Sequence, residues 1–114
     1  MNDCIFCKIA AGQIKATLVY EDDRVVAFRD IHPQAPVHIL IIPKQHIDRV
    51  SSLTEKTLPL VMDIHRVALK IAEQEKVTNE GFRLVTNSGK MSGQTVDHLH
   101  YHLMAGRKLS WPPG

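Results

Sequence analysis

Histidine alternates with apolar residues near the end of the chain, in the segment His98-Leu99-His100-Tyr101-His102-Leu103-Met104. Successive side chains of a β-strand point to opposite faces of a sheet, so the pattern predicts a strand with its three histidines on one face. Leu99, Tyr101 and Leu103 would then face a hydrophobic core. Neighbouring imidazoles on such a strand are about 7 Å apart, close enough for the three rings to line one phosphate-sized site.

Size and composition favour one soluble globular domain over residues 1–114. The hydrophobic (44%) and charged (23%) fractions are ordinary for such a domain. A net charge of +2, without a dense cluster of Lys and Arg, gives no reason to expect a nucleic-acid polymer as partner. Mononucleotides remain compatible with this balance.

The sequence contains no segment typical of export or membrane insertion. Its longest apolar run, Ile39–Ile42, is far shorter than the ~20 residues that span a bilayer. The start, Met1-Asn2-Asp3-Cys4, lacks the basic and apolar regions of a secretory signal. We therefore expect a cytoplasmic protein with no membrane partner.

Local patterns along the chain predict an α+β fold. Ser52-Leu53-Thr54-Glu55 matches a helix capping box, and apolar residues at helical spacing continue to Gln74. Because proline is tolerated only in a first turn, Pro59 places the start of this helix at residues 54 to 58. Strands are expected at Thr17–Glu21, Val25–Arg29, Val37–Ile42, Phe82–Asn87 and His98–Met104. Their connections suit an antiparallel sheet.

The histidine strand also indicates a chemistry. An imidazole is largely neutral near pH 7, because its ordinary pKa is about 6.5, and it can then attack phosphorus. His100, with an imidazole on either side, is the candidate nucleophile, and His102 would assist the leaving group. His38 joins them if its strand lies close to theirs; otherwise it is a buried core histidine. The loop Ser92-Gly93-Gln94-Thr95 offers amides and a hydroxyl that can cradle a phosphate.

Cys4 and Cys7 form a C-x-x-C pair and are the two cysteines of the chain. In a protein that is not exported, this spacing points to metal or redox chemistry before a structural disulfide. With His46 and His98 as further ligands, the pair would form a closed, tetrahedral zinc site of the structural type. A surface thiol pair and a redox motif are the alternatives.

Two further residues have structural interpretations. His65, among apolar residues of the predicted helix, is expected to be partly buried packing. Trp111 precedes two prolines and is expected at the surface, in contact with a partner subunit or the rim of a pocket.

The segment Gly93–Met104 resembles the histidine triad motif of the HIT family, and the resemblance extends over nearly the whole chain. It is closest to the Hint branch of purine nucleoside phosphoramidases. The other segments that carry it are Glu21-Asp22-Asp23, Phe28-Arg29-Asp30-Ile31, Pro33-Gln34-Ala35-Pro36, His38, Ile42-Pro43-Lys44, Asn87, Gly106-Arg107 and Trp111-Pro112-Pro113-Gly114.

This resemblance implies a HIT-like fold, an antiparallel sheet of about five strands with one long helix and a short N-terminal helix, in a homodimer. It implies hydrolysis of AMP-amine substrates through a nucleotidyl-histidine at His100, whose other ring nitrogen donates to the carbonyl of His98, with no catalytic metal. The implied catalytic residues are His100, His102, His38 and Thr95. The implied nucleotide-binding residues are Asp30, Ile31, Asn87, Gly93, Gln94, Thr95, His100, His102 and Trp111. The implied zinc ligands are Cys4, Cys7, His46 and His98.

The sequence departs from the Hint pattern at Thr95, where serine is frequent, and at Asp97, where an aromatic or apolar residue is common. Three alternatives follow. One is a dinucleoside polyphosphate hydrolase, against which the C-terminal tail argues. Another is a purine-nucleotide-binding regulatory module with vestigial catalysis, motivated by Asp97 and Trp111. The last is a zinc-stabilised structural dimer.

Overall fold

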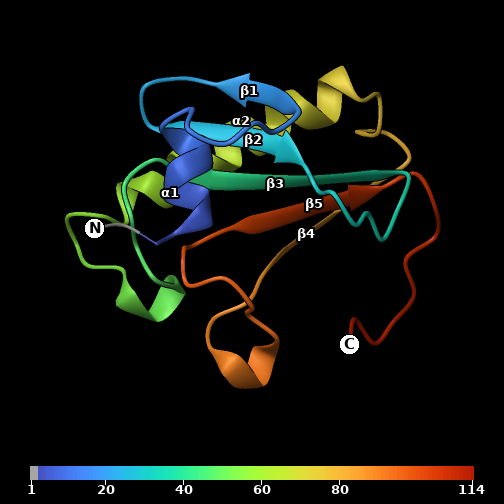
Figure 1. The fold of residues 1–114 in the computed structure, drawn as a ribbon. Helices are drawn as coiled ribbons and strands as arrows, with labels where there is room; N and C mark the ends of the chain where they lie inside the picture. Colours follow the sequence, from blue (N-terminus) through green and yellow to red (C-terminus); the bar gives the residue numbers. More distant parts are fainter. Residues whose placement is uncertain (1–2) are drawn as a thin grey trace.

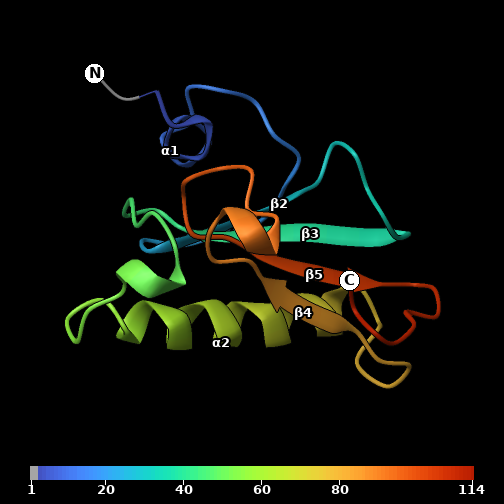
Figure 2. The same ribbon diagram turned by 90° about the horizontal axis from the view of Figure 1, so that it is seen from below.

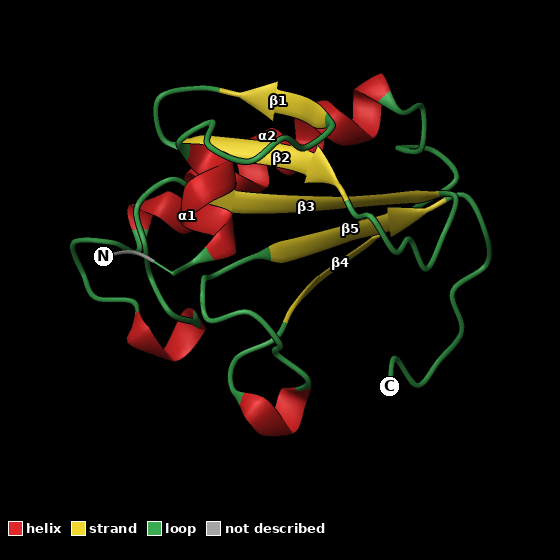
Figure 3. Cartoon of the chain, in the orientation of Figure 1, coloured by secondary structure: helices red, strands yellow, loops and turns green. Residues whose placement is uncertain are grey.

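Five strands form one antiparallel sheet in the computed structural model, which describes residues 3–114 (Figures 1 and 3). Their order across the sheet is β1-β2-β3-β5-β4, and every neighbouring pair is antiparallel. The strands are β1 (Leu18–Glu21), β2 (Val25–Arg29), β3 (Val37–Pro43), β4 (Arg83–Thr86) and β5 (Tyr101–Ala105). The predicted α+β fold with a five-stranded antiparallel sheet is therefore confirmed.

Two α-helices cover opposite faces of this sheet (Figure 2). The long helix α2 (Pro59–Gln74) runs along one face, against β1, β2 and β3, and the short helix α1 (Ile5–Ala10) lies on the other. Two 3₁₀ turns, η1 (Val50–Ser52) and η2 (Lys90–Ser92), lie in the connections. Neither α-helix in the described part of the chain has the length and apolar character needed to span a bilayer.

The face under α2 holds the larger hydrophobic core. Ile39 and Ile41 of β3 meet Ile64 of α2 there, and all three are fully buried. The apolar residues that alternate with the histidines pack into the same core, as the pattern predicted; they are Leu99, Tyr101 and Leu103.

The face under α1 holds a smaller core around one aromatic residue. Phe6 is the buried residue of α1, and its ring meets Phe28 of β2 edge to face at 5.5 Å. Val26, Leu40 and Ile42 complete this cluster. Because one short helix covers this face, room remains on it for side chains that are not part of a hydrophobic core.

The helix α2 begins later than its sequence pattern predicts. It starts at Pro59 instead of residues 54 to 58, its N-cap is Leu58, and no side chain caps it. Thr57 explains the difference, because its Oγ1 accepts from the backbone N–H of Thr54 at 2.8 Å and holds a separate turn there. The predicted capping box is therefore wrong, whereas the predicted end at Gln74 is confirmed.

The strand β5 also begins later than predicted, at Tyr101 instead of His98. The reason lies in the facing residues. Pro43 of β3 has no N–H to donate, and the N–H of Leu99 donates to the carbonyl of Ile47 at 2.6 Å instead of to β3. Side chains still alternate through this segment, since Leu99 is in the core while His98 and His100 are directed to the α1 face.

Candidate active site

His100 is buried on the α1 face, and a backbone hydrogen bond sets its protonation pattern. Its Nδ1 lies 2.7 Å from the carbonyl oxygen of His98. A carbonyl can only accept, so Nδ1 carries the proton and Nε2 keeps its lone pair. The ring of Phe6 packs edge to face against His100, with 5.1 Å between centroids. His100 therefore has the fixed orientation and the available lone pair that a nucleophile needs.

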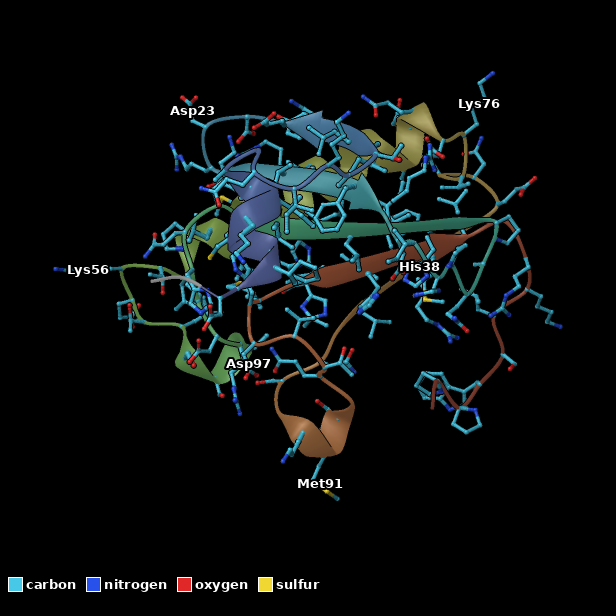
Figure 4. All side chains as sticks on the ribbon, viewed as in Figure 1. Asp23, His38, Lys56, Lys76, Met91 and Asp97 are labelled. Atoms are coloured by element: carbon cyan, nitrogen blue, oxygen red, sulfur yellow. The ribbon has the colours of Figure 1, made fainter. Side chains whose placement is uncertain are left out.

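A second hydrogen-bond chain orients His102. The backbone N–H of Gln34 donates to Nδ1 of His38 at 3.0 Å, so His38 carries its proton on Nε2. That nitrogen lies 2.9 Å from Nδ1 of His102 and 3.4 Å from Oδ2 of Asp30. With Nδ1 accepting, His102 carries its proton on Nε2. Figure 4 shows His38 where β3 runs beside β5.

Burial keeps this pair of histidines neutral. Burial, together with the nearby His100 and His38, lowers the pKa of His102 to about 4, although Asp30 opposes the shift. Burial also lowers the pKa of His38, although the carboxylate of Asp30 opposes the shift. At neutral pH His102 is therefore a hydrogen-bond donor through Nε2–H and not a cation.

A mostly apolar cavity of about 370 Å³ opens over the two histidines. Five of the predicted site residues line it: Asp30, Ile31, Thr95, His100 and His102. Ile31 is largely exposed at its edge, and the Oδ1 of Asp30 accepts from the backbone N–H of His32. The cavity thus joins an apolar wall, a carboxylate and two imidazoles, a combination of groups typical of small-molecule sites.

Four other predicted nucleotide-binding residues do not line this cavity: Asn87, Gly93, Gln94 and Trp111. The side chain of Gln94 holds the loop together, because it accepts from Gly89 N and donates to the carbonyls of Asp48 and Val96. Asn87 Nδ2 donates to the carbonyl of Ser92 at 2.6 Å. These two residues shape the loop beside the site, and Trp111 is 82% exposed.

The four predicted metal ligands lie together at the start of α1. The ligand atoms of Cys4, Cys7, His46 and His98 are all within 4.8 Å of one another. Nδ1 of His98 is 3.2 Å from Sγ of Cys4, and Nδ1 of His46 is 3.2 Å from Sγ of Cys7. Two sulfurs and two imidazole nitrogens are the donors of a structural, tetrahedral zinc site.

The partners of the outer ring nitrogens fit that role. Nε2 of His98 donates to the carbonyl of Pro43 at 2.8 Å, and Nε2 of His46 donates to Oδ1 of Asp48 at 2.8 Å. Each Nδ1 lone pair is thereby directed at the sulfurs, as second-shell hydrogen bonds do for metal-bound histidines. Asp30, His38 and His102 form another close group, but Nε2 of His38 is already hydrogen-bonded to Nδ1 of His102 and lies 3.4 Å from Oδ2 of Asp30.

The three histidines of the triad do not share one site, contrary to the simplest expectation from their spacing. His100 and His102 line the cavity on the α1 face with rings 5.1 Å apart, closer than strand geometry alone suggests. His98 is fully buried and turns its Nδ1 toward the cysteines. The alternation puts the three rings on one face of the sheet. The rotamer of each ring depends on its own hydrogen-bond partner, which differs among the three histidines.

Sequence reasoning missed the contribution of the N-terminal segment to the cavity. Ile5, Phe6 and Ile9 of α1 line it, and Ile14 and Lys15 extend the wall beyond the helix. The cysteine pair was the available signal, because a shared metal site with His98 places the intervening residues beside the triad.

Comparison with known proteins agrees with this architecture. Residues 11–109 match the HIT domain. The chain is 52% identical to an uncharacterised HIT-like protein of Synechococcus elongatus, over 99% of this chain and 98% of that protein. It is 47% identical to a 14 kDa zinc-binding protein of Brassica juncea, over 98% of this chain and all of that protein (100%).

Solved structures give the same result. A HIT family hydrolase from Legionella pneumophila Philadelphia 1 superposes with a TM-score of 0.96 at 48% identity, covering 98% of this chain and 100% of that one. A histidine triad protein from Clostridium difficile gives a TM-score of 0.94 at 51% identity, with 96% of each chain covered. On this sequence match, fold and arrangement of histidines, the chain belongs to the HIT family.

Proposed function

We propose that the protein is a purine nucleoside phosphoramidase, a hydrolase that transfers a nucleotidyl group to His100 and then to water. The observation that supports this most is the hydrogen bond from His100 Nδ1 to the carbonyl of His98, which leaves the Nε2 lone pair for phosphorus. Similarity to HIT family hydrolases supports the reaction class.

In the first step, His100 attacks the phosphorus of a bound nucleoside 5′-phosphoramidate. The Nε2–P bond forms, the P–N bond breaks, and the amine leaves with a proton that the hydroxyl of Thr95 relays from solvent. Thr95 suits this relay because it lines the cavity and is exposed. The carbonyl of His98 stabilises the positive charge that develops on the phosphorylated imidazole.

In the second step, a water molecule attacks the nucleotidyl-histidine. The P–Nε2 bond breaks, AMP is released, and the proton of the water returns to solvent through Thr95. His102 donates from Nε2 to a phosphoryl oxygen in both transition states, and His38 holds it in the donating tautomer. The net reaction consumes one water and yields a nucleoside monophosphate and an amine.

The nucleotide is held along the cavity. The carboxylate of Asp30 accepts from the ribose hydroxyls, since its oxygens lie at the cavity wall beside His38. The apolar wall around Ile31 and Phe28 packs against the purine. The phosphate is proposed to lie beside Thr95, which follows the turn formed by the positive φ of Gly93.

Zinc is proposed as a structural ion held by Cys4, Cys7, His46 and His98. The similarity to a zinc-binding protein of Brassica juncea supports this, as do the paired sulfur and nitrogen donors. A closed site with four protein ligands leaves no position for a catalytic water. The ion therefore stabilises the fold, and the chemistry stays with the histidines.

A cytoplasmic homodimer is also proposed. Exposed apolar residues form a stripe along α2, at Leu58, Met62 and Leu69, with the exposed His65 between them. His65 was predicted to be partly buried, and that prediction is wrong, although its ring contacts Tyr101. The strand β4 is at an edge of the sheet, and its unpaired side offers a second place for another copy to bind.

The decisive experiment is to mix the protein with an adenosine phosphoramidate and quench at neutral pH within milliseconds. Mass spectrometry of the peptides should find an AMP adduct on His100. The alternative hydrolase would instead consume diadenosine polyphosphates faster than the phosphoramidate. AMP binding with no adduct and no amine released would contradict the proposed function and favour a binding module.

A further inference from the structure

The short helix α1 takes part in two sites at once. Cys4 caps it, with its Sγ accepting from the backbone N–H of Cys7 at 3.3 Å, and both cysteines belong to the group of four potential zinc ligands. Between them, Ile5 lines the nucleotide cavity and Phe6 packs on the ring of His100. One turn of helix thus carries two thiols and part of the catalytic pocket.

In the part of the chain that the structure describes, α1 packs against the sheet through a small apolar cluster. The helix has six residues, of which Phe6 is the buried one. An isolated helix of this length is unstable in water, so its position depends on its tertiary contacts. Those contacts are the small cluster around Phe6 and the ligand group shared with His46 and His98.

His98 connects the two sites through a single residue. Its Nδ1 lies 3.2 Å and 3.5 Å from the sulfurs of Cys4 and Cys7. Its own carbonyl oxygen accepts from Nδ1 of His100 at 2.7 Å. The ring of Phe6 lies against both His98 and His100. A displacement of the His98 backbone would therefore move the carbonyl oxygen to which His100 Nδ1 donates.

We propose that Cys4 and Cys7 are positioning residues for the reaction, and that their oxidation to a disulfide releases zinc, loosens α1 and lowers both nucleotide affinity and turnover. The C-x-x-C spacing at a helix start is that of dithiols that are oxidised readily. The part that concerns turnover rests on the proposed function, whereas the part that concerns nucleotide affinity does not.

The oxidation balances with a peroxide as oxidant. Two zinc-bound thiolates lose two electrons and form one S–S bond, while the O–O bond of hydrogen peroxide breaks to give two hydroxide ions. The zinc ion leaves because the disulfide no longer supplies thiolate ligands. Solvent reaches the cluster through a surface cleft of about 480 Å³ that Cys4 and His46 line.

The test starts from zinc-loaded protein and adds hydrogen peroxide stepwise. Three quantities are measured together: zinc released to a coloured chelator, AMP affinity by calorimetry, and the ¹⁵N shifts of the His100 ring. We expect one zinc per chain to be released, AMP binding to weaken about tenfold or more, and the Nδ1–H tautomer of His100 to lose its dominance. Dithiothreitol with added zinc should reverse all three changes.

Methionine oxidation needs a matched control. Met91 is fully exposed on η2, where Figure 4 shows it pointing away from the sheet. Its sulfoxide would not be reduced by dithiothreitol. The variant Met91→Leu should therefore respond to peroxide in the same way as the parent protein. If peroxide no longer weakens AMP binding in Met91→Leu, then oxidation of Met91 and not of the cysteines causes the effect, and the proposal is wrong.

Two variants test the thiols directly. Cys4→Ser/Cys7→Ser should bind AMP as weakly as the oxidised protein and be indifferent to peroxide. Should it fail to fold by circular dichroism, His46→Gln serves instead, because it removes an exposed ligand and keeps both thiols. That variant should lose zinc at lower peroxide concentrations, with AMP affinity falling in step.

If peroxide releases zinc but AMP affinity and the His100 tautomer stay unchanged, then the proposed coupling between the two thiols and the nucleotide cavity is refuted. This result can be distinguished from a failure of the proposed hydrolase function. If no phosphoramidate is hydrolysed under any condition but AMP affinity follows the thiols, then the hydrolase assignment is wrong and the coupling stands.

Discussion

The two faces of the sheet are built differently. The face under α2 is filled with fully buried aliphatic side chains such as Ile39, Ile41 and Ile64. The face under α1 has a cluster around Phe6, and beside it lie the buried histidines His98 and His100. One face supplies the buried apolar area that stabilises the fold, and the other exposes backbone and side-chain groups to a ligand.

This difference explains how a small domain can hold polar groups in its interior. A buried imidazole is costly unless its nitrogens are hydrogen-bonded. On the α1 face each histidine has such partners: His98 has Pro43, His100 has the carbonyl of His98, and His38 pairs with His102. The hydrophobic core on the α2 face stabilises the fold and so offsets the cost of burying these polar groups.

The largest effect is expected at the nucleophile. His100→Ala should reduce hydrolysis of an adenosine phosphoramidate by at least about a thousandfold, because no other group forms the covalent intermediate. AMP affinity, measured by calorimetry, should remain within a few-fold of the parent, about threefold at most. If the His100→Ala variant still hydrolyses the phosphoramidate at the parent rate, then the reaction does not take place on the α1 face.

On the opposite face, Ile64→Ala should act on stability alone. Ile64 is fully buried against the sheet, so the cavity should lower the free energy of unfolding by about 2–5 kcal/mol. Urea unfolding gives this value, and AMP affinity of the folded protein should be unchanged. A large loss of affinity would show that the two faces are not independent.

The outer side of α2 should decide the oligomeric state. Met62→Glu places a charge in the exposed apolar stripe and should convert the proposed dimer to monomer at micromolar concentration, as light scattering would record. Lys56→Glu, at an exposed position before α2, is the matched control and should remain dimeric. A parent protein that is already monomeric would refute the proposed dimer.

A smaller effect is expected from Phe6→Leu on the α1 face. The substitution keeps an apolar side chain but removes the edge-to-face contact with His100, which is worth about 0.5–1.5 kcal/mol. We expect kcat/KM to fall about 2- to 10-fold, with a modest change in unfolding midpoint. If the parent protein and Phe6→Leu have equal kcat/KM, then Phe6 contributes only apolar packing and does not position His100.

The smallest effect concerns pH. His102 has a pKa of about 4 in the folded protein against 6.5 as its ordinary value, lowered by burial and by its neighbours His100 and His38, with Asp30 opposing. Between these values the unfolded chain binds more protons, so stability falls as pH falls from 6.5 to 4. His102→Asn should flatten this part of a plot of unfolding free energy against pH. If the curves of unfolding free energy against pH are parallel for the parent protein and His102→Asn, then His102 does not cause the pH dependence.

Much of this arrangement could be predicted from residue patterns. The alternation of histidine with Leu99, Tyr101 and Leu103 predicted which side chains enter the core, because the period of a strand is fixed by backbone geometry. The C-x-x-C pair predicted that Cys4, Cys7, His46 and His98 lie together as potential metal ligands, because few donor sets satisfy a tetrahedral site. Element ends were less predictable, as Thr57 and Pro43 show, since single local hydrogen bonds move them.

The amino-acid order alone was thus sufficient for the fold class and for the face of the sheet that carries the histidines. Side-chain direction was not readable from it, because a rotamer depends on partners that are distant in sequence. His98 turned to cysteines at the other end of the chain, Gln34 set the tautomer of His38, and α1 became a wall of the cavity. These contacts come from long-range packing, which brings donors and acceptors together only after the sheet has formed.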